Sequence, residues 1–212
     1  DGDALVGAMV CFLKSDSYGE YVFDWSWADA YHRHGLNYYP KCVTAIPFTP
    51  ATGPRLLIQD GYDRGVVTEL LIKTLKSELS DQVSSWHILF PDEETSRDLL
   101  TQGSWLKRHG VQFHWFNQGF ETFDDHLATF NSKRRKEARR ERRRVQEQGI
   151  EFERLSGHAI DREALETLFQ CYQMTYRVRG SRGYLTREFF ELVVARIPDA
   201  IRVAFALHQG KR

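Results

Sequence analysis

Residues 123–150 have the sequence FDDHLATFNSKRRKEARRERRRVQEQGI, which carries the strongest charge signal of the chain. Between Lys133 and Arg144 there are nine Lys or Arg and two Glu, a formal charge of plus seven. The whole chain is formally neutral, so the remaining residues together carry minus seven. The charge is therefore unevenly distributed along the chain, and one internal basic segment carries the excess of positive charge.

This basic segment is predicted to be a helix. It consists of strong helix formers, contains almost no β-branched residues and stops at Gly149, ahead of a strand-like sequence. Asn131 and Ser132 are both suitable N-caps, and Asp124 or Asp125 could cap a shorter helix just before it. Its apolar face is too thin for a helix buried in a core.

Two interpretations of the basic helix follow from the sequence. In one, it is a solvated face whose Arg stems cover apolar surface while their charged ends pair with acidic residues. In the other, it faces phosphate, because seven of its nine cationic residues are Arg, whose planar guanidinium matches phosphate oxygens. General DNA binding is disfavoured, since the chain has no second basic patch and no recognisable nucleic-acid module. The second interpretation assigns phosphate binding to Arg135, Arg139, Arg142 and Arg143.

Three stretches of the chain resemble a known family. RRKEARRERRRVQEQGIEFERL, residues 134–155, is similar to the Arg-rich helix and following strand of the Fem-type aminoacyltransferases and their relatives in the GNAT superfamily. Residues 17–57, SYGEYVFDWSWADAYHRHGLNYYPKCVTAIPFTPATGPRLL, and residues 110–128, GVQFHWFNQGFETFDDHLA, resemble the FemAB-like family of peptidoglycan biosynthesis or recognition. The resemblance extends over nearly the whole chain.

The resemblance implies an α/β fold, with a GNAT-like mixed sheet flanked by helices and parts of two tandem GNAT-like units. The opening DGDALVGAMV is similar to the second strand of a GNAT hairpin, and the closing AIRVAFALHQGKR to the first strand of a matching hairpin. We therefore expect residues 1–122 to be the C-terminal part of a first unit, 123–149 a basic connecting helix region, and 150–212 the N-terminal part of a second unit. Each unit would then be incomplete, and these 212 residues alone are expected to show weak or no turnover.

Composition is consistent with a globular protein. A chain of 212 residues, 42% hydrophobic and 13% aromatic, can bury a sizeable core and suits one large or two small domains. No apolar run approaches the roughly 18 residues of a membrane span. Three widely spaced cysteines without a CxxC pair indicate free thiols in a reducing compartment, so the cytoplasm is the expected location. Asp1 rather than Met stands first, which leaves open whether a targeting segment precedes it.

Alternating strand and helix patterns support the α/β class. Strands are predicted at residues 4–13, 41–47, 86–90, 112–116, 150–155 and 201–207. Besides the basic helix, helices are predicted at residues 25–34, 65–79, 92–100, 162–176 and 187–195. In the helix at 65–79, the residues expected to face the core are Val66, Leu70, Ile72, Leu75 and Leu79.

An acidic and aromatic cluster at residues 18–27 is the strongest candidate for chemistry. The implied acyl transfer requires a positioned amine, a group that accepts its proton and donors that stabilise the oxyanion. Glu20 and Asp24 are the candidate bases, because aromatic neighbours would lower the dielectric and raise the pKa of a carboxylate. In the alternative interpretation, Asp24 caps the helix that begins at Trp25 and the aromatic residues are core. Tyr18 is a candidate substrate contact.

Two further segments contain candidate substrate-binding residues. Residues 174–186, MTYRVRGSRGYLT, only superficially resemble the phosphate-binding loop of acetyltransferases, and are expected to form a helix–helix loop over the acceptor. An ordinary flexible loop is the alternative there. Residues 38–57 hold a Pro-rich turn that would stiffen a pocket rim. The candidates in the two segments are Tyr176, Arg179, Tyr184, Tyr39, Lys41 and Arg55.

The sequence offers no zinc-ligand spacing, P-loop, dinucleotide fingerprint or nucleophile elbow, so neither a metal nor a nicotinamide cofactor is expected. The resemblance implies transfer of an acyl or aminoacyl group to an amine acceptor, such as a cell-wall precursor. The donor stays undecided between acyl-CoA and aminoacyl-tRNA, the latter making tRNA a candidate partner. The alternative function is a non-catalytic module that binds an anionic polymer or partner through the basic helix.

Overall fold

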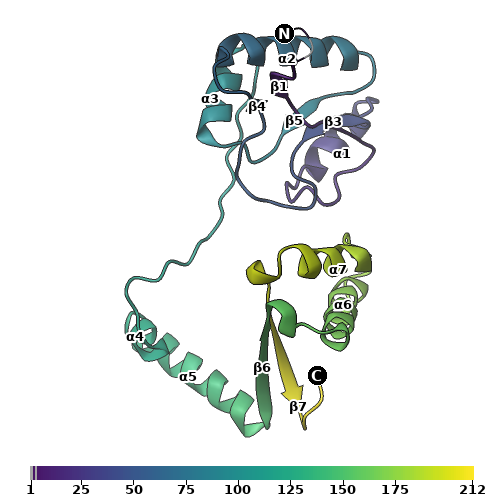
Figure 1. Cartoon of the computed structure of the whole chain (residues 1–212). Coiled ribbons are helices and arrows are strands. Elements are labelled where there is room, and N and C mark those ends of the chain that lie inside the picture. The colour runs from purple at the N-terminus through teal and green to yellow at the C-terminus, as the bar shows by residue number, and fades with distance from the viewer. Residues whose placement is uncertain (1, 3) are drawn as a thin grey trace. The chain divides into compact units, whose positions relative to one another are not determined.

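The computed structural model describes residue 2 and residues 4–212, which form two compact units, Asp1–Gly110 and Val111–Arg212. Asp1 and Asp3, within the opening segment predicted to be a hairpin strand, lie outside the described residues. Seven α-helices and three small sheets make a mixed α/β fold across the described chain, which confirms the predicted class (Figure 1).

The first unit is organised around β3 (Lys41–Thr44), whose four residues are all buried. It lies between β2 (Phe12–Lys14), which is antiparallel to it, and β5 (Trp86–Ile88), which is parallel to it. A separate antiparallel pair joins β1 (Gly7–Ala8) to β4 (Leu57–Ile58). The helices of this unit are α1 (Trp25–Arg33), α2 (Arg64–Leu79) and α3 (Glu93–Thr101).

A small apolar core holds the first unit together. Leu56, Ile72 and Leu99 are each at most 5% exposed, and the half-buried Leu71 and Trp86 pack against them. Aspartates begin two of the helices: the Asp63 side chain accepts from the Val66 amide, and that of Asp92 from the Thr95 amide. The burial of these apolar side chains drives the packing of α2 and α3.

In the second unit, β6 (Ile150–Ser156) and β7 (Arg202–His208) are antiparallel over their full length, from Ile150 opposite His208 to Ser156 opposite Arg202. Leu168 of α6 (Arg162–Arg177) and Val194 of α7 (Arg187–Arg196) pack against the buried Val203 and Phe205 of β7. Two short 3-10 turns, at Gly157–Ala159 and Pro198–Ala200, lie at one end of the pair.

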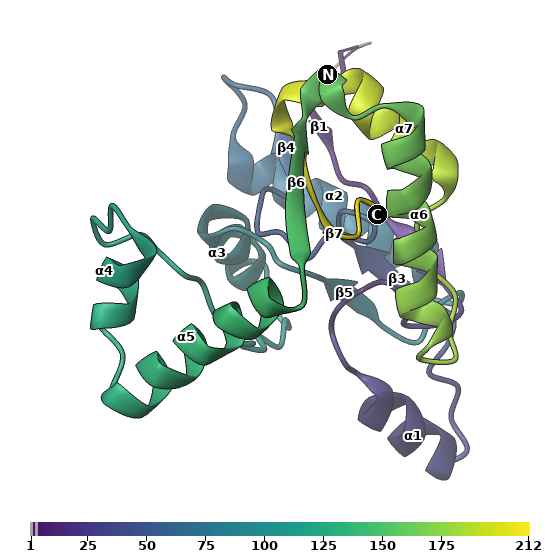
Figure 2. The same ribbon diagram turned by 90° about the horizontal axis from the view of Figure 1, so that it is seen from below.

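The basic segment forms α5 (Ser132–Glu147), and Asn131 is its N-cap, one of the two residues predicted for that role. Gly149, at a φ of 68°, ends the helix, and β6 follows directly (Figure 2). The helix before it is α4 (Phe123–Ala128), and its N-cap is Thr122 instead of one of the predicted aspartates. Asp125 is the third residue of that helix, and its carboxylate accepts from the Thr122 amide in a capping box.

Three sequence expectations about the elements were wrong. Residues 112–116 form no strand, because no described segment pairs with them and an unpaired strand leaves its amides and carbonyls unsatisfied. Residues 4–13 contain β1 and the beginning of β2 instead of one strand. Val66 and Leu70 of α2 are 62% and 65% exposed, since the helix is apolar on more than one side and buries Val67 instead.

A buried carboxylate–ammonium network as candidate functional site

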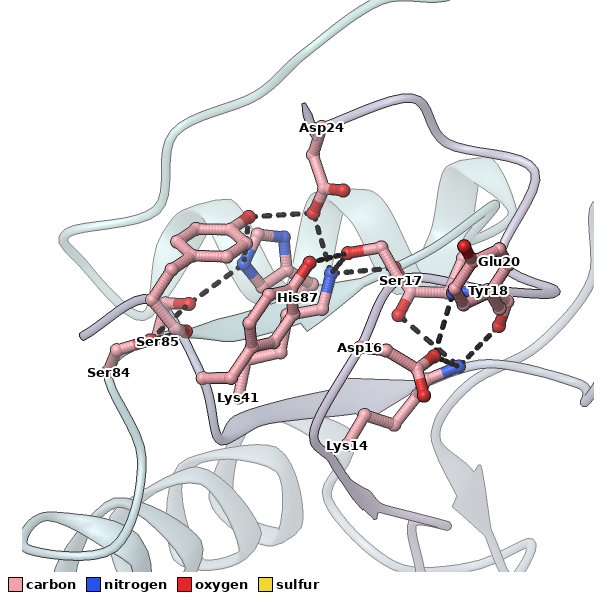
Figure 3. A network of polar contacts seen from close by, with 12 residues as sticks. Lys14, Asp16, Ser17, Tyr18, Glu20, Asp24, Lys41, Ser84, Ser85 and His87 are labelled. Carbon is pink, nitrogen blue, oxygen red and sulfur yellow. Dashed lines mark hydrogen bonds and ion pairs between the residues drawn. The ribbon is translucent and has the colours of Figure 1, made fainter. Parts of the chain in front are cut away.

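Lys41 is the centre of a polar network inside the first unit. Its side chain has no exposed surface. Lys is almost never fully buried unless its charge has a partner. The ammonium nitrogen donates to Ser17 Oγ at 2.7 Å, Glu20 Oε2 at 2.9 Å and Asp24 Oδ2 at 2.6 Å (Figure 3). These three acceptors use all three N–H groups of the ammonium.

The acceptors come from one segment, residues 15–24, whose course is set by local turns. The Asp16 side chain accepts from the Tyr18 amide at 2.8 Å, and the Lys14 ammonium donates to the Tyr18 carbonyl at 2.6 Å. Gly19 has a φ of 75°, and a Cβ there would lie 2.3 Å from the Phe48 ring. A glycine is therefore required at the bend that turns Glu20 inward.

Tyrosine and histidine side chains extend the network. Tyr38 donates to Asp24 Oδ2 at 2.7 Å, and Tyr39 OH lies 2.7 Å from Ser17 Oγ. The rings of both tyrosines lie near the Lys41 ammonium, 5.3 and 5.7 Å from ring centre to nitrogen. His87 Nε2 lies 3.4 Å from Tyr38 OH and 2.9 Å from Ser85 Oγ. We call Ser17, Glu20, Asp24, Tyr38, Tyr39, Lys41 and His87 the Lys41 network.

The network carries one more negative than positive charge. Asp24 and Glu20 are 1% and 6% exposed and share the single Lys41 ammonium. Among the described residues, no donor hydrogen-bonds to Asp24 Oδ1 or to Glu20 Oε1, although both atoms are buried. The partly exposed Lys14 lies 3.5 Å from Glu20 Oε1, an ion-pair distance without hydrogen-bond geometry. Two buried acceptor oxygens therefore remain open to a donor.

Burial and charge shift several pKa values here. Burial would raise the pKa of Asp24, but hydrogen bonds from Lys41 and Tyr38 outweigh burial and hold the pKa below 3.8. Burial, reinforced by the Asp24 hydrogen bond, raises the pKa of Tyr38, so its phenol stays protonated. Burial and the Lys41 charge lower the pKa of His87, which favours its neutral form. The expectation of a raised carboxylate pKa was thus wrong for Asp24.

The structure contradicts the alternative in which Asp24 caps a helix and the aromatic residues near it are core, while the catalytic role stays a prediction. Asp24 precedes α1, but its side chain makes no capping hydrogen bond and instead binds Lys41 and Tyr38. Trp25 and Trp27 are 45% and 42% exposed, so they are surface residues and not core. The aromatic surroundings of the carboxylates come instead from Tyr38 and Tyr39. Tyr18, the other candidate here, is 56% exposed with its ring against Trp25.

Arg55 lies in the first unit but outside the network. Its guanidinium donates to the carbonyls of Leu89, Pro54 and Ala51, at 2.8, 3.2 and 2.6 Å. It therefore braces the Pro-rich turn from inside, with only 5% of its surface exposed.

The remaining predicted residues lie in the second unit. Arg135 donates to three carbonyls at the end of α4, Arg139 pairs with Asp124 at 2.8 Å, and the Arg142 guanidinium lies 4.0 Å from the Phe123 ring centre. The fourth predicted phosphate ligand on α5 is the exposed Arg143. Their role in phosphate binding stays a prediction.

The loop after α6 is folded back on that helix. Tyr176 and Tyr184 meet edge to face at 5.4 Å, while Arg179 is exposed. Tyr172 OH accepts from the Leu185 amide at 2.9 Å. A cavity of about 310 Å³ beside this loop is lined by Gln173, Arg177, Ser181, Arg182, Gly183 and Leu185.

Four of the residues that the network brings together were predicted from sequence: Glu20, Asp24, Tyr39 and Lys41. Ser17, Tyr38 and His87 were missed. For His87 a signal exists, because it is a titratable residue in the middle of the otherwise apolar segment at residues 86–90. Within the described residues, no three His, Cys, Asp or Glu side chains cluster as metal ligands. No helix of the described chain has both the length and the apolar character needed to cross a bilayer.

The protein is thus of the mixed α/β class, and its candidate site is a buried network in which two carboxylates share one ammonium. Comparison with family models identifies it further: the model of the FemAB-like family, described as peptidoglycan biosynthesis/recognition, matches residues 1–212. The chain therefore belongs to the FemAB-like family. Searches of curated proteins and of solved structures found no match.

Proposed function

We propose that the protein transfers an acyl or aminoacyl group from a carrier to an amine acceptor in peptidoglycan precursor metabolism. Family membership supports the cell-wall context. The observation that carries the chemistry is a pair of buried oxygens without a hydrogen-bond donor, Glu20 Oε1 and Asp24 Oδ1, in a cluster whose two carboxylates share one buried ammonium. A protonated amine supplies the N–H donors that these two oxygens lack.

The two carboxylates are given different roles in this proposal. Asp24 accepts two hydrogen bonds on Oδ2 and has a lowered pKa, which makes it a fixed anion suited to orienting the amine. Glu20 accepts one hydrogen bond, from Lys41, and is the better placed of the two to take a proton. Lys41 positions both and does not itself touch the acceptor.

The reaction follows from this arrangement. Glu20 takes a proton from the bound ammonium, and the resulting neutral amine nitrogen attacks the acyl carbonyl carbon. When the tetrahedral intermediate collapses, the bond between the acyl carbon and the sulfur or oxygen of the carrier breaks, and the second N–H proton passes to that leaving atom. The carrier is either acyl-CoA or aminoacyl-tRNA. Both are cytoplasmic molecules, so the proposal implies a cytoplasmic reaction.

Salt-dependent binding distinguishes the two carriers. A titration with charged tRNA, uncharged tRNA and a panel of acyl-CoAs is run across a salt series. Preference for charged tRNA with a steep salt dependence identifies aminoacyl-tRNA as the donor, and binding of CoA thioesters alone identifies acyl-CoA.

Turnover by the complete gene product, with the identified donor and a peptidoglycan-precursor amine, then tests the site. We expect E20Q to lower kcat by about 10²-fold or more, as loss of a general base does. D24N is expected mainly to raise KM, because it removes the anion that orients the amine. D81N, at an exposed position, is the matched control and should keep wild-type rates. Unchanged kinetics in both site variants would overturn the proposal.

The non-catalytic alternative receives less support. Arg135, Arg139 and Arg142 of the basic helix are engaged with the backbone, an aspartate and an aromatic ring next to α4. Their charge is thus partly committed within the second unit.

A further inference from the structure

Two cysteines meet on the face of the central sheet opposite to Lys41. In the pairing of β2 with β3, Leu13 lies opposite Cys42 and Phe12 opposite Val43, so Cys11 comes next to Thr44. Side chains alternate along a strand, which places Cys11, Cys42 and Thr44 on one face. The Cys11 sulfur lies 3.2 Å from Thr44 Oγ1, and Cys42 is the diagonal neighbour of Cys11 on the same face.

The hydrogen bonds have a direction that favours a thiolate at Cys11. Trp86 Nε1 can only donate, and it donates to Thr44 Oγ1 at 3.0 Å. Thr44 therefore has its hydroxyl proton available for the Cys11 sulfur. Cys42 and Thr44 are fully or almost fully buried, with 0% and 2% exposure, whereas Cys11 is half-buried and accessible. A buried hydroxyl, oriented by Trp86, thus donates to one accessible sulfur, and a buried thiol lies beside it.

The two thiols acquire opposite character from this contact. The hydrogen bond from Cys42, aided by that from Thr44, overcomes burial and lowers the pKa of Cys11 to about 6. The same contact, together with burial, raises the pKa of Cys42. One thiol is a nucleophile at neutral pH, and its neighbour holds a proton.

We propose that Cys11 is a peroxide-reactive site and that Cys42 resolves it as an intramolecular disulfide. The proposal is independent of acyl transfer, since it uses neither the Lys41 network nor a substrate.

The chemistry balances with a peroxide as the oxidant. The Cys11 thiolate attacks one oxygen of the peroxide, the O–O bond breaks, and with a proton from solvent the products are Cys11 sulfenic acid and an alcohol or water. The Cys42 sulfur then attacks the Cys11 sulfur, and the sulfenic oxygen leaves as water with the Cys42 proton. Two thiols lose two electrons and two protons in total, and the peroxide is reduced.

Peptide mass spectrometry tests the disulfide directly. The folded protein is treated with hydrogen peroxide, its remaining thiols are alkylated, and it is digested without reductant. We expect a peptide pair that joins Cys11 to Cys42, lighter by two hydrogens than its parts and released by dithiothreitol. The exposed Cys171 is the internal control and should be recovered as the alkylated thiol.

Variants separate the two steps. In C42S, Cys11 should accumulate as sulfenic acid, trapped by dimedone, because no resolving thiol is present. In C11S, the buried Cys42 should remain a free thiol. If peroxide leaves Cys11 alkylated in the wild type and yields no dimedone adduct in C42S, the proposal is wrong.

The hydrogen bond from the Thr44 hydroxyl to the Cys11 sulfur can be tested separately. At pH 6 a thiol with a pKa of about 6 is half ionised, against about 0.3% for an ordinary pKa of 8.5. T44V removes one donor at nearly constant shape, and we expect iodoacetamide to alkylate Cys11 about threefold or more slowly in this variant. T49V removes an exposed hydroxyl that bonds the Pro47 carbonyl, and should leave the Cys11 rate unchanged. Equal rates in T44V and wild type would contradict the assigned donor.

Discussion

At the scale of single residues, Lys41 determines whether the first unit can tolerate its buried carboxylates. Two anions and one ammonium lie together out of water, and each charge is costly there unless it is compensated. The ammonium compensates both carboxylates, while Ser17 and Tyr38 satisfy further hydrogen bonds. Such a cluster does not stabilise a fold by itself, but removing one member leaves uncompensated charge.

We therefore expect K41M to destabilise the first unit by about 3–5 kcal/mol, because it removes the one buried cation and leaves Asp24 without a counter-charge and Glu20 with only the partly exposed Lys14. Urea denaturation followed by tryptophan fluorescence measures the loss. K14M is the matched control: Lys14 is partly exposed and 3.5 Å from Glu20, so its loss should cost about 1 kcal/mol or less. Similar losses in the two variants would contradict the role assigned to Lys41.

Asp24 adds a dependence of stability on pH. Its pKa in the folded protein lies below the ordinary 3.8, so in acid the unfolded chain binds its proton first and is favoured. The stabilisation is fully present above the unfolded-state pKa and is lost as pH falls through the folded-state pKa.

The free energy of unfolding, measured by urea titrations from pH 6 downward, should thus fall below about pH 4 in the wild type. D24N cannot titrate at this position, and its curve should fall less steeply over the same range. Parallel curves for the two proteins would show that Asp24 does not contribute to the acid sensitivity.

The site was only partly predictable at this scale. Glu20, Asp24, Tyr39 and Lys41 could be proposed because charged and aromatic residues were close together in the sequence. The contact of Tyr38 with His87 could not, although His87 stands out in an apolar segment, because the pairing of β3 with β5 brings the two together across 49 positions of the chain. The lowered pKa of Asp24 was equally hidden, since it depends on the ammonium of Lys41.

At the scale of elements, the basic helix α5 has two kinds of arginine. Arg135 faces α4 and donates to the carbonyls of Leu127 and Ala128 at the C-terminal end of α4 and to that of Phe130 just beyond it. Arg143, on the same helix, is exposed. Sequence predicted the helix and its N-cap from composition, but could not separate these faces, because that requires the position of α4.

R135A is expected to lower the free energy of unfolding of the second unit by about 1.5–3 kcal/mol, as loss of charged hydrogen bonds to carbonyls does. R143A on the same helix is the matched control and should change stability by at most about 0.5 kcal/mol. Guanidinium denaturation followed by circular dichroism measures both. An equal, small effect of the two substitutions would mean that Arg135 does not fasten α4 to α5.

At the scale of the whole molecule, the chain forms two compact units that meet in sequence at Gly110 and Val111. Sequence composition gave no sign of a boundary there, since the segment is rich in aromatic residues and resembles a strand. Of the two compact units, the second contains both α4 and α5. The family resemblance predicts a different division: part of a first GNAT-like unit in residues 1–122, a connecting helix region in 123–149 and part of a second unit in 150–212. This division stays a prediction.

The segment around this boundary provides the last prediction. Residues 104–118 contain no helix or strand (Figure 1), and Leu106, Val111 and Phe113 are 87%, 84% and 96% exposed. Proteases cut where backbone is exposed and not hydrogen-bonded. We therefore expect brief chymotrypsin treatment to cleave first after Phe113, Trp115 or Phe116, giving two fragments that resist further digestion and are identified by mass spectrometry. Phe205 in β7 is 7% exposed and should survive as the internal control. First cleavage within a helix or strand of either unit, outside residues 104–118, would contradict both the boundary and the compactness of that unit.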